Sequence, residues 1–311
     1  MTDYLNIGIR FALYANLMLL FGLPLFALYA LRGAERLHDA VLPVRALTGS
    51  LSLSGIALST LSITAMTASM AGVQLSQVDP ASVGMMIFET PMGNAWTVRL
   101  LALLCIVAAA FWMGATKGLP NLVFMALGSG AALASLAWTG HGAASEGSAG
   151  TAQLIADIIH LLAAGAWLGA LAALTIILFR GAEALNDEYL AMTHRLLKGF
   201  SVAGSVIVAL VLGSGLVNSW MLVGPQNVMT LYTTLYGQLL IAKLILFAMM
   251  LVIAATNRFK LTPAFERALQ SGGTSGAVIR LRQSLALEIC TALFILGLVA
   301  WLGTLAPPVS M

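Results

Sequence analysis

Charged side chains are scarce in this chain of 311 residues, since Asp, Glu, Lys and Arg together make up 9%. Soluble domains carry roughly 25% charged residues, so a single water-soluble globule is excluded. A net charge of +3 on a chain of this size gives no indication of a nucleic-acid partner. Hydrophobic residues make up 60% and the mean hydropathy is +0.95, so most of the surface must face lipid.

Cysteine is also rare, and the two cysteines lie in separate apolar runs. Cys105 and Cys290 therefore provide neither a disulfide framework nor a CxxC metal site. We interpret both as inert core thiols, and the alternative is that a thiol inside the bundle binds a soft metal ion in passage. No cleavable signal peptide is expected, because Asp3 rather than a basic residue precedes the first apolar run. A phosphate-binding GxxxxGK[ST] loop is absent as well, so the sequence shows no energy source, and we do not expect an enzyme.

Long apolar runs, by contrast, are abundant. A bilayer core about 30 Å thick requires about 20 apolar residues per helix. Eight segments meet this requirement and predict an all-α membrane protein, a bundle of eight transmembrane helices. They are residues 7–31, 46–72, 95–115, 121–139, 152–179, 199–222, 235–256 and 284–304.

Lys and Arg are unevenly distributed among the connections between these segments. The connections after the first, third, fifth and seventh segments carry basic residues, whereas residues 73–94, 140–151 and 223–234 carry none. The positive-inside rule therefore places the basic connections in the cytoplasm and both termini in the periplasm. The outward connections carry acidic side chains instead, which suits them to cations.

A short motif occurs twice, each time at the start of a segment predicted to run inward. Thr90-Pro-Met-Gly93 is followed six residues later by Arg99, and Thr234-Leu-Tyr-Gly237 is followed six residues later by Lys243. Four crossings separate the two copies, which predicts two parallel four-helix repeats. The expected halves are residues 1–139 and residues 140–311.

Ionisable residues inside apolar segments are costly in lipid, so each one is a candidate functional residue. Asp157 and His160 stand three residues apart on the fifth segment and therefore share one helix face. His141 lies just beyond the fourth segment, and the short connection could bring it over His160. A hydrogen bond to a neighbouring helix is the alternative role for His160, and a simple turn is the alternative for His141.

Three further charged residues lie inside apolar segments. Arg99 and Lys243 are expected to snorkel to the outer surface, because helical side chains lean toward the N-terminus. The alternative is that one of them is the counter-charge of Asp157. Glu288 is expected to snorkel at the inner surface or to pair with Arg282.

Two methionines, Met66 and Met70, form an i, i+4 pair at the outer end of the second segment. Thioether sulfur selects Cu(I), and imidazole suits copper in both oxidation states as well as zinc. Asp157 could ligate such a metal, or it could accept the second N–H of His160 and orient the ring. Packing is the alternative role for both methionines.

A series of short motifs follows in order between Trp138 and Pro307. They are Gly140-His141, Asp157-x-x-His160-Leu-x-Ala-x-x-x-Trp167-x-Gly169, Phe200-Ser201, Gly215-Leu-Val-Asn218, Thr234-x-x-Gly237-Gln-x-Leu-x-x-Lys243, Asn257-Arg258 and Gly303-Thr-Leu-Ala-Pro307. This series resembles the CopD domain of the copper resistance protein D family. In some members a second His stands at the position of Asp157, so the carboxylate here would be a harder ligand or an orienting partner.

The resemblance implies a multi-pass protein of the bacterial inner membrane that functions in copper homeostasis. It would take copper, as Cu(I) or Cu(II), from the periplasm as a permease supplied by a small CopC-like copper-binding partner. The expected metal ligands are His160, His141, Asp157, Met66 and Met70. Two alternatives remain: a b-type haem or quinone-linked membrane oxidoreductase, and a sensor or buffer of periplasmic copper without transport.

Overall fold

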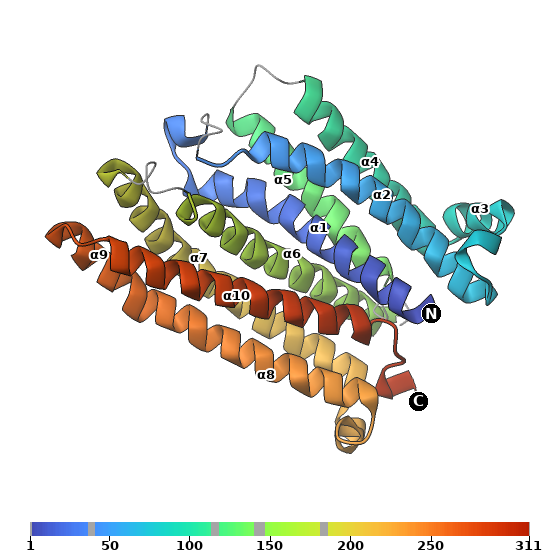
Figure 1. Cartoon of the computed structure of the whole chain (residues 1–311). Coiled ribbons are helices and arrows are strands. Elements are labelled where there is room, and N and C mark those ends of the chain that lie inside the picture. Colours follow the sequence, from blue (N-terminus) through green and yellow to red (C-terminus); the bar gives the residue numbers. More distant parts are fainter. Residues whose placement is uncertain (1, 37–40, 113–117, 140–146, 181–185, 311) are drawn as a thin grey trace.

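The computed structural model describes residues 2–36, 41–112, 118–139, 147–180 and 186–310 (Figure 1). Within these ranges the regular elements are helices and none is a strand. Eight spans are long and apolar enough to cross a membrane, which confirms the predicted all-α class and the number of crossings. The spans are built on α1 (Thr2–Ala30), α2 (Val44–Ala71), α4 (Pro91–Trp112), α5 (Leu119–Ala134), α6 (Gly147–Leu178), α7 (Asp187–Val223), α8 (Leu235–Thr256) and α10 (Ser275–Leu302).

Several helices extend beyond the apolar runs that predicted them. α7 begins at Asp187 rather than at residue 199, and α10 begins at Ser275 rather than at residue 284. α8 continues through the π-helix η7 (Asn257–Leu261) into the amphipathic α9 (Thr262–Ser271). Residues 73–94, predicted as a connection, contain a further helix, α3 (Pro80–Glu89). Hydropathy detects the lipid-facing length of a helix and misses amphipathic turns beyond it, which explains these differences.

The spans form one bundle in which α1 and α6 are central. α1 packs against α2, α5, α6 and α10, and α6 packs in addition against α7 (Figure 1). α4 covers α2 and α5 on one side, and α8 covers α10 on the other. Both ends of the chain and α3 lie at one end of the bundle, called here the termini end, and α9 lies at the opposite end, the α9 end (Figure 1).

The contact between α1 and α6 is a backbone contact made by glycine. A Cβ atom on Gly22 would lie 2.2 Å from the Gly165 carbonyl oxygen, and a Cβ on Gly169 would lie 2.2 Å from the Gly22 Cα. Gly165 and Gly169 form a GxxxG pair, which lets two membrane helices approach to backbone distance. Since no larger residue fits, these glycines set the distance between the two central helices.

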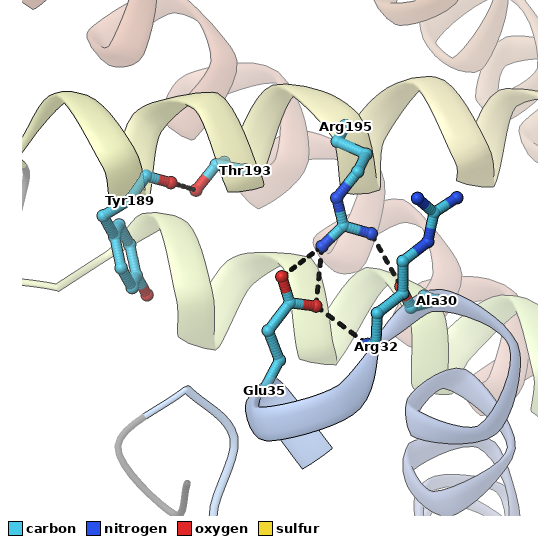
Figure 2. A network of polar contacts seen from close by, with 6 residues as sticks. All are labelled: Ala30, Arg32, Glu35, Tyr189, Thr193 and Arg195. Atoms are coloured by element: carbon cyan, nitrogen blue, oxygen red, sulfur yellow. Dashed lines mark hydrogen bonds and ion pairs between the residues drawn. The ribbon is translucent and has the colours of Figure 1, made fainter.

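Arginines at the α9 end bind the terminal carbonyl groups of the helices. Arg195 on α7 donates to the Ala30 carbonyl at the end of α1 at 3.1 Å, and its Nη2 contacts both oxygens of Glu35 at 2.5 and 2.6 Å (Figure 2). Glu35 also accepts the backbone N–H of Arg32 at 2.8 Å. The last carbonyls of a helix have no partner within the helix and carry partial negative charge, so cations stabilise them. The basic residues predicted to orient the bundle therefore also cap its helices.

The repeated motif begins α4 and α8 in the same way. The Thr90 hydroxyl accepts the Gly93 N–H at 3.0 Å, and the Thr234 hydroxyl accepts the Gly237 N–H at 3.2 Å. A Cβ on either glycine would lie within 2.3 Å of the preceding backbone, that of α3 or of the 3-10 helix η6 (Pro225–Leu231). Each motif therefore starts a helix and folds a short helix tightly over its first turn.

Replacing Gly169 by Ala is expected to destabilise the bundle by about 1–3 kcal/mol, because the new methyl group would push α1 away from α6. Thermal unfolding of the purified protein in detergent measures the effect. Gly213→Ala on α7 is the matched control, since nothing lies within 4 Å of a Cβ there. Equal unfolding midpoints for Gly169→Ala and the unaltered protein would contradict the close contact.

Candidate metal centre

His160 lies on α6 against the backbone of α7. Its Nδ1 atom is 3.1 Å from the Ser214 hydroxyl. A Cβ added to Gly215 would lie 3.4 Å from the Cε1 atom of the ring, at van der Waals contact, so the imidazole lies directly against this part of α7. The imidazole ring of His160 is thus held between α6 and α7.

The hydrogen bonds of Ser214 favour one tautomer of His160. The Ser214 hydroxyl lies 2.5 Å from the Leu210 carbonyl, to which it can donate its one proton. With that proton given to Leu210, the Ser214 oxygen accepts from His160, an arrangement that favours the ring proton on Nδ1. A neutral imidazole with this proton has its lone pair on Nε2, the atom through which it can bind a metal ion.

Asp157 lies one helical turn closer to the start of α6, and its partners come from α7 and α8. The Asn218 side chain hydrogen-bonds the Asp157 carboxylate. The half-buried Lys243 on α8 interacts electrostatically with both Asp157 and His160. Lys243 thus has the counter-charge role that the sequence offered as the alternative to snorkelling. Asp157, His160, Ser214, Asn218 and Lys243 are called the α6 polar cluster below.

Glu288 does not behave as the sequence predicted. It is 2% exposed, and its two oxygens accept hydrogen bonds from Trp167 Nε1 at 3.1 Å and Asn257 Nδ2 at 2.8 Å. Arg282, its expected partner, instead donates to the Leu178 carbonyl at the end of α6 at 2.8 Å. Burial against two neutral donors therefore replaces the predicted ion pair.

A cavity of about 310 Å³ lies beside Glu288, between α6, α7, α8 and α10. Trp167, Asn257 and Glu288 line it together with mainly apolar side chains. Asn257 is the first residue of the π-helix, a type of irregularity that is frequent at functional sites. Trp167 follows His160 by two turns on α6, so this cavity lies further from the start of α6 than the α6 polar cluster.

The remaining predicted ligands lie elsewhere. Met66 lines a second cavity of about 200 Å³ between α1, α2 and α4, and Met70 is 70% exposed on α2. α1 lies between α2 and α6, so the structure does not bring these methionines to His160 (Figure 1). His141 falls outside the described residues. Within the described ranges no three His, Cys, Asp or Glu side chains gather as a metal site, and the α6 polar cluster supplies two.

Sequence reasoning found Asp157 and His160 but missed the groups of α7 that hold them. Ser214 and Asn218 are polar residues four apart in an otherwise apolar segment, and they therefore share one face of α7. Asp157 and His160, three residues apart, likewise share one face of α6. Two helices that each carry a pair of polar residues on one face were the available signal that these faces meet.

Asp157→Asn and Lys243→Met are each expected to destabilise the protein, because each leaves a charge inside the bundle without its counter-charge. The double variant should be more stable than the sum of the single effects predicts, with a coupling of about 0.5–3 kcal/mol. Chemical unfolding of all four proteins in mixed micelles measures this cycle. Strictly additive effects would show that the two charges do not interact.

Comparisons with known proteins agree with this architecture. The family model "Copper resistance protein D-like, N-terminal domain" matches residues 1–151, and the model "Copper resistance protein D" matches residues 194–302. Copper resistance protein D of Pseudomonas syringae pv. tomato is 46% identical over 311 residues, which cover 99% of this chain and 98% of that protein. No solved structure matches the chain.

Two more distant relatives also match. Inner membrane protein YebZ of Escherichia coli strain K12 is 30% identical over 267 residues, 85% of this chain and 86% of that protein. Copper transport protein CutJ of Bacillus subtilis strain 168 is 31% identical over 262 residues, 80% of this chain and 45% of that protein. With its eight apolar spans, the chain is a multi-pass protein of the inner membrane. Matches of this extent, in both halves and to a full-length relative, confirm the resemblance seen in the sequence: the chain belongs to the copper resistance protein D family.

Proposed function

We propose that this protein binds copper at the α6 polar cluster and takes it from the periplasm as a permease of the inner membrane. The observation that carries the proposal is that His160, held through Nδ1 against Ser214, shares one face of α6 with Asp157, one turn away. The names of two relatives, one in copper resistance and one in copper transport, support copper as the cargo. A CopC-like periplasmic protein would supply the ion.

The proposed orientation places the termini end in the periplasm. It rests on the basic residues, which gather at the α9 end and cap helices there, as expected of the cytoplasmic side. Asp157 and His160, near the start of α6, then lie in the outer part of the bundle. The matching starts of α4 and α8 support the proposal that the two four-helix halves are parallel repeats.

The chemistry of the cluster suits a single copper ion held weakly enough to move on. His160 Nε2 is a ligand for either oxidation state, and Asp157 is a harder ligand that also neutralises Lys243. Copper and Lys243 therefore compete for the same carboxylate. His141 would add a second imidazole, and the exposed Met70 would meet Cu(I) at the periplasmic surface.

His160→Ala is expected to weaken copper binding by more than tenfold, and Ser214→Ala by about tenfold because the ring loses its orienting partner. Competition with a chelator for Cu(I), and calorimetry for Cu(II), measure both effects on protein purified in detergent. His194→Ala, at the α9 end, is the matched control and should bind copper as the unaltered protein does. Unchanged affinity in His160→Ala would remove this residue from the site.

The substitution Lys243→Met is expected to change copper affinity in the opposite direction from His160→Ala. Removal of a cation from the cluster should tighten copper binding, because Asp157 then has no competing counter-charge. The same competition assay measures it, and Lys198→Met, exposed at the α9 end, controls for loss of one positive charge. Weaker binding in Lys243→Met than in this control would contradict ligation by Asp157.

A measurement of transport requires the protein in sealed vesicles. Proteoliposomes containing the unaltered protein should accumulate copper, whereas those containing His160→Ala should accumulate little. Binding without accumulation would instead indicate a sensor or buffer. A Soret band in the visible spectrum of the purified protein would favour the haem alternative.

A further inference from the structure

We infer that the second cavity, between α1, α2 and α4, is a binding site for a phosphate-type oxyanion. The cavity measures about 200 Å³ and lies at the termini end. Two guanidinium groups, those of Arg10 and Arg99, line it, and no Asp or Glu is among the described residues that do. It is called the Arg10–Arg99 cavity below.

Arg99 is the most deeply buried charge in this part of the bundle. It is 1% exposed, and its Nε donates to the Ser135 hydroxyl at 2.9 Å. Its Nη2 atom is buried and has no hydrogen-bond partner among the residues that the structure describes. An unsatisfied donor on a buried charge is costly, and in natural proteins such a group points to a ligand or an ion. Arg99 was predicted to snorkel to the surface; it faces the cavity instead.

Arg10 approaches the same cavity from α1. Its Nε is also buried and has no partner within the described ranges, and its guanidinium lies over the Tyr14 ring, 5.8 Å from the ring centre. The other side of this group lies against Gly303, where a Cβ would be 2.2 Å from Arg10 Nη2. Tyr14 and Gly303 thus hold the guanidinium in place at the cavity wall.

Comparison with the other half of the chain shows what the Arg10–Arg99 cavity lacks. Arg99 and Lys243 occupy the same position after equivalent helix starts, six residues beyond Gly93 and Gly237. Lys243 interacts with Asp157, whereas neither Arg99 nor Arg10 forms an ion pair with any residue that the structure describes. Two positive charges at this depth favour a negative charge beside them, which we propose comes from a ligand.

The geometry favours an oxyanion with several oxygens. Each guanidinium is a planar fork that binds two oxygens of one anion, and the two forks come from different helices. A tetrahedral phosphate can present separate oxygens to both. Hydroxyl groups of Ser62, Ser69 and Thr304 also line the cavity and can donate to the remaining oxygens. The volume admits a phosphate group but not a large organic anion.

Two sources can supply such a group at the boundary of a membrane. One is free inorganic phosphate, and the other is the phosphate of a lipid headgroup. Both would bind the same guanidinium groups. The proposal is independent of copper, because the cavity and the α6 polar cluster share no residue.

The test measures thermal unfolding of the full chain with each source in turn. Inorganic phosphate added to the protein in detergent, or phosphatidylglycerol in nanodiscs compared with phosphatidylcholine alone, should raise the midpoint by about 2–4 °C. Arg99→Met and Arg10→Met should each abolish this rise. Lys198→Met is the control and should retain it.

If inorganic phosphate raises the unfolding midpoint and both arginine variants lose this rise, the result supports a site for a free anion. If only phosphatidylglycerol raises the midpoint and the same variants lose this rise, the result supports a site for a lipid headgroup. Arg10→Met keeps the test valid if Arg99→Met does not fold, because Arg10 is half-buried. No rise with either source, or an equal rise in the variants, would overturn the proposal.

Discussion

The glycine contact between α1 and α6 is the constraint on which the rest of the structure depends. With Gly165 and Gly169 turned toward Gly22, residues such as His160, five positions earlier, face roughly the opposite side of α6. That side is covered by α7. The backbone contact therefore fixes both the spacing of the two central helices and the direction in which the polar face of α6 points. A rotation of α6 would separate His160 from Ser214.

Charge in the interior of the bundle follows a second constraint, because each buried charge needs a partner where water is scarce. The chain meets it in three ways. Asp157 and Lys243 compensate each other across two helices. Glu288 accepts hydrogen bonds from two neutral donors beside a cavity. Arg99 lines a cavity, with one donor satisfied by Ser135 and another without a partner among the described residues. The last case is the one on which the proposed anion site rests.

The sequence predicted what depends on local pattern and missed what depends on packing. The apolar runs predicted the eight crossings. The spacing of three residues between Asp157 and His160 predicted that they share one helix face. The partners of Glu288 and Lys243 come from other helices, and nothing in local spacing shows which helices meet. Snorkelling of Arg99 was wrong because Ser135 offers it a buried acceptor, which single-helix geometry does not contain. Residue 141 lies outside the described ranges, so its place beside His160 stays a prediction.

The two halves of the chain use one helix start to opposite electrostatic effect. After each Thr-x-x-Gly cap, a cation follows six residues later, at the same depth from the termini end, because the helix geometry fixes its position. What it meets there depends on the facing helix. α6 presents a carboxylate and an imidazole to Lys243, and the result is a cluster in which the carboxylate and the ammonium group compensate each other's charge. α1 presents Arg10 to the side of Arg99, and the result is a cavity lined by two guanidinium groups and, among the described residues, by no carboxylate. Met66 lines that cavity, apart from the α6 polar cluster, so its role as a copper ligand stays a prediction and would need a site separate from that of His160.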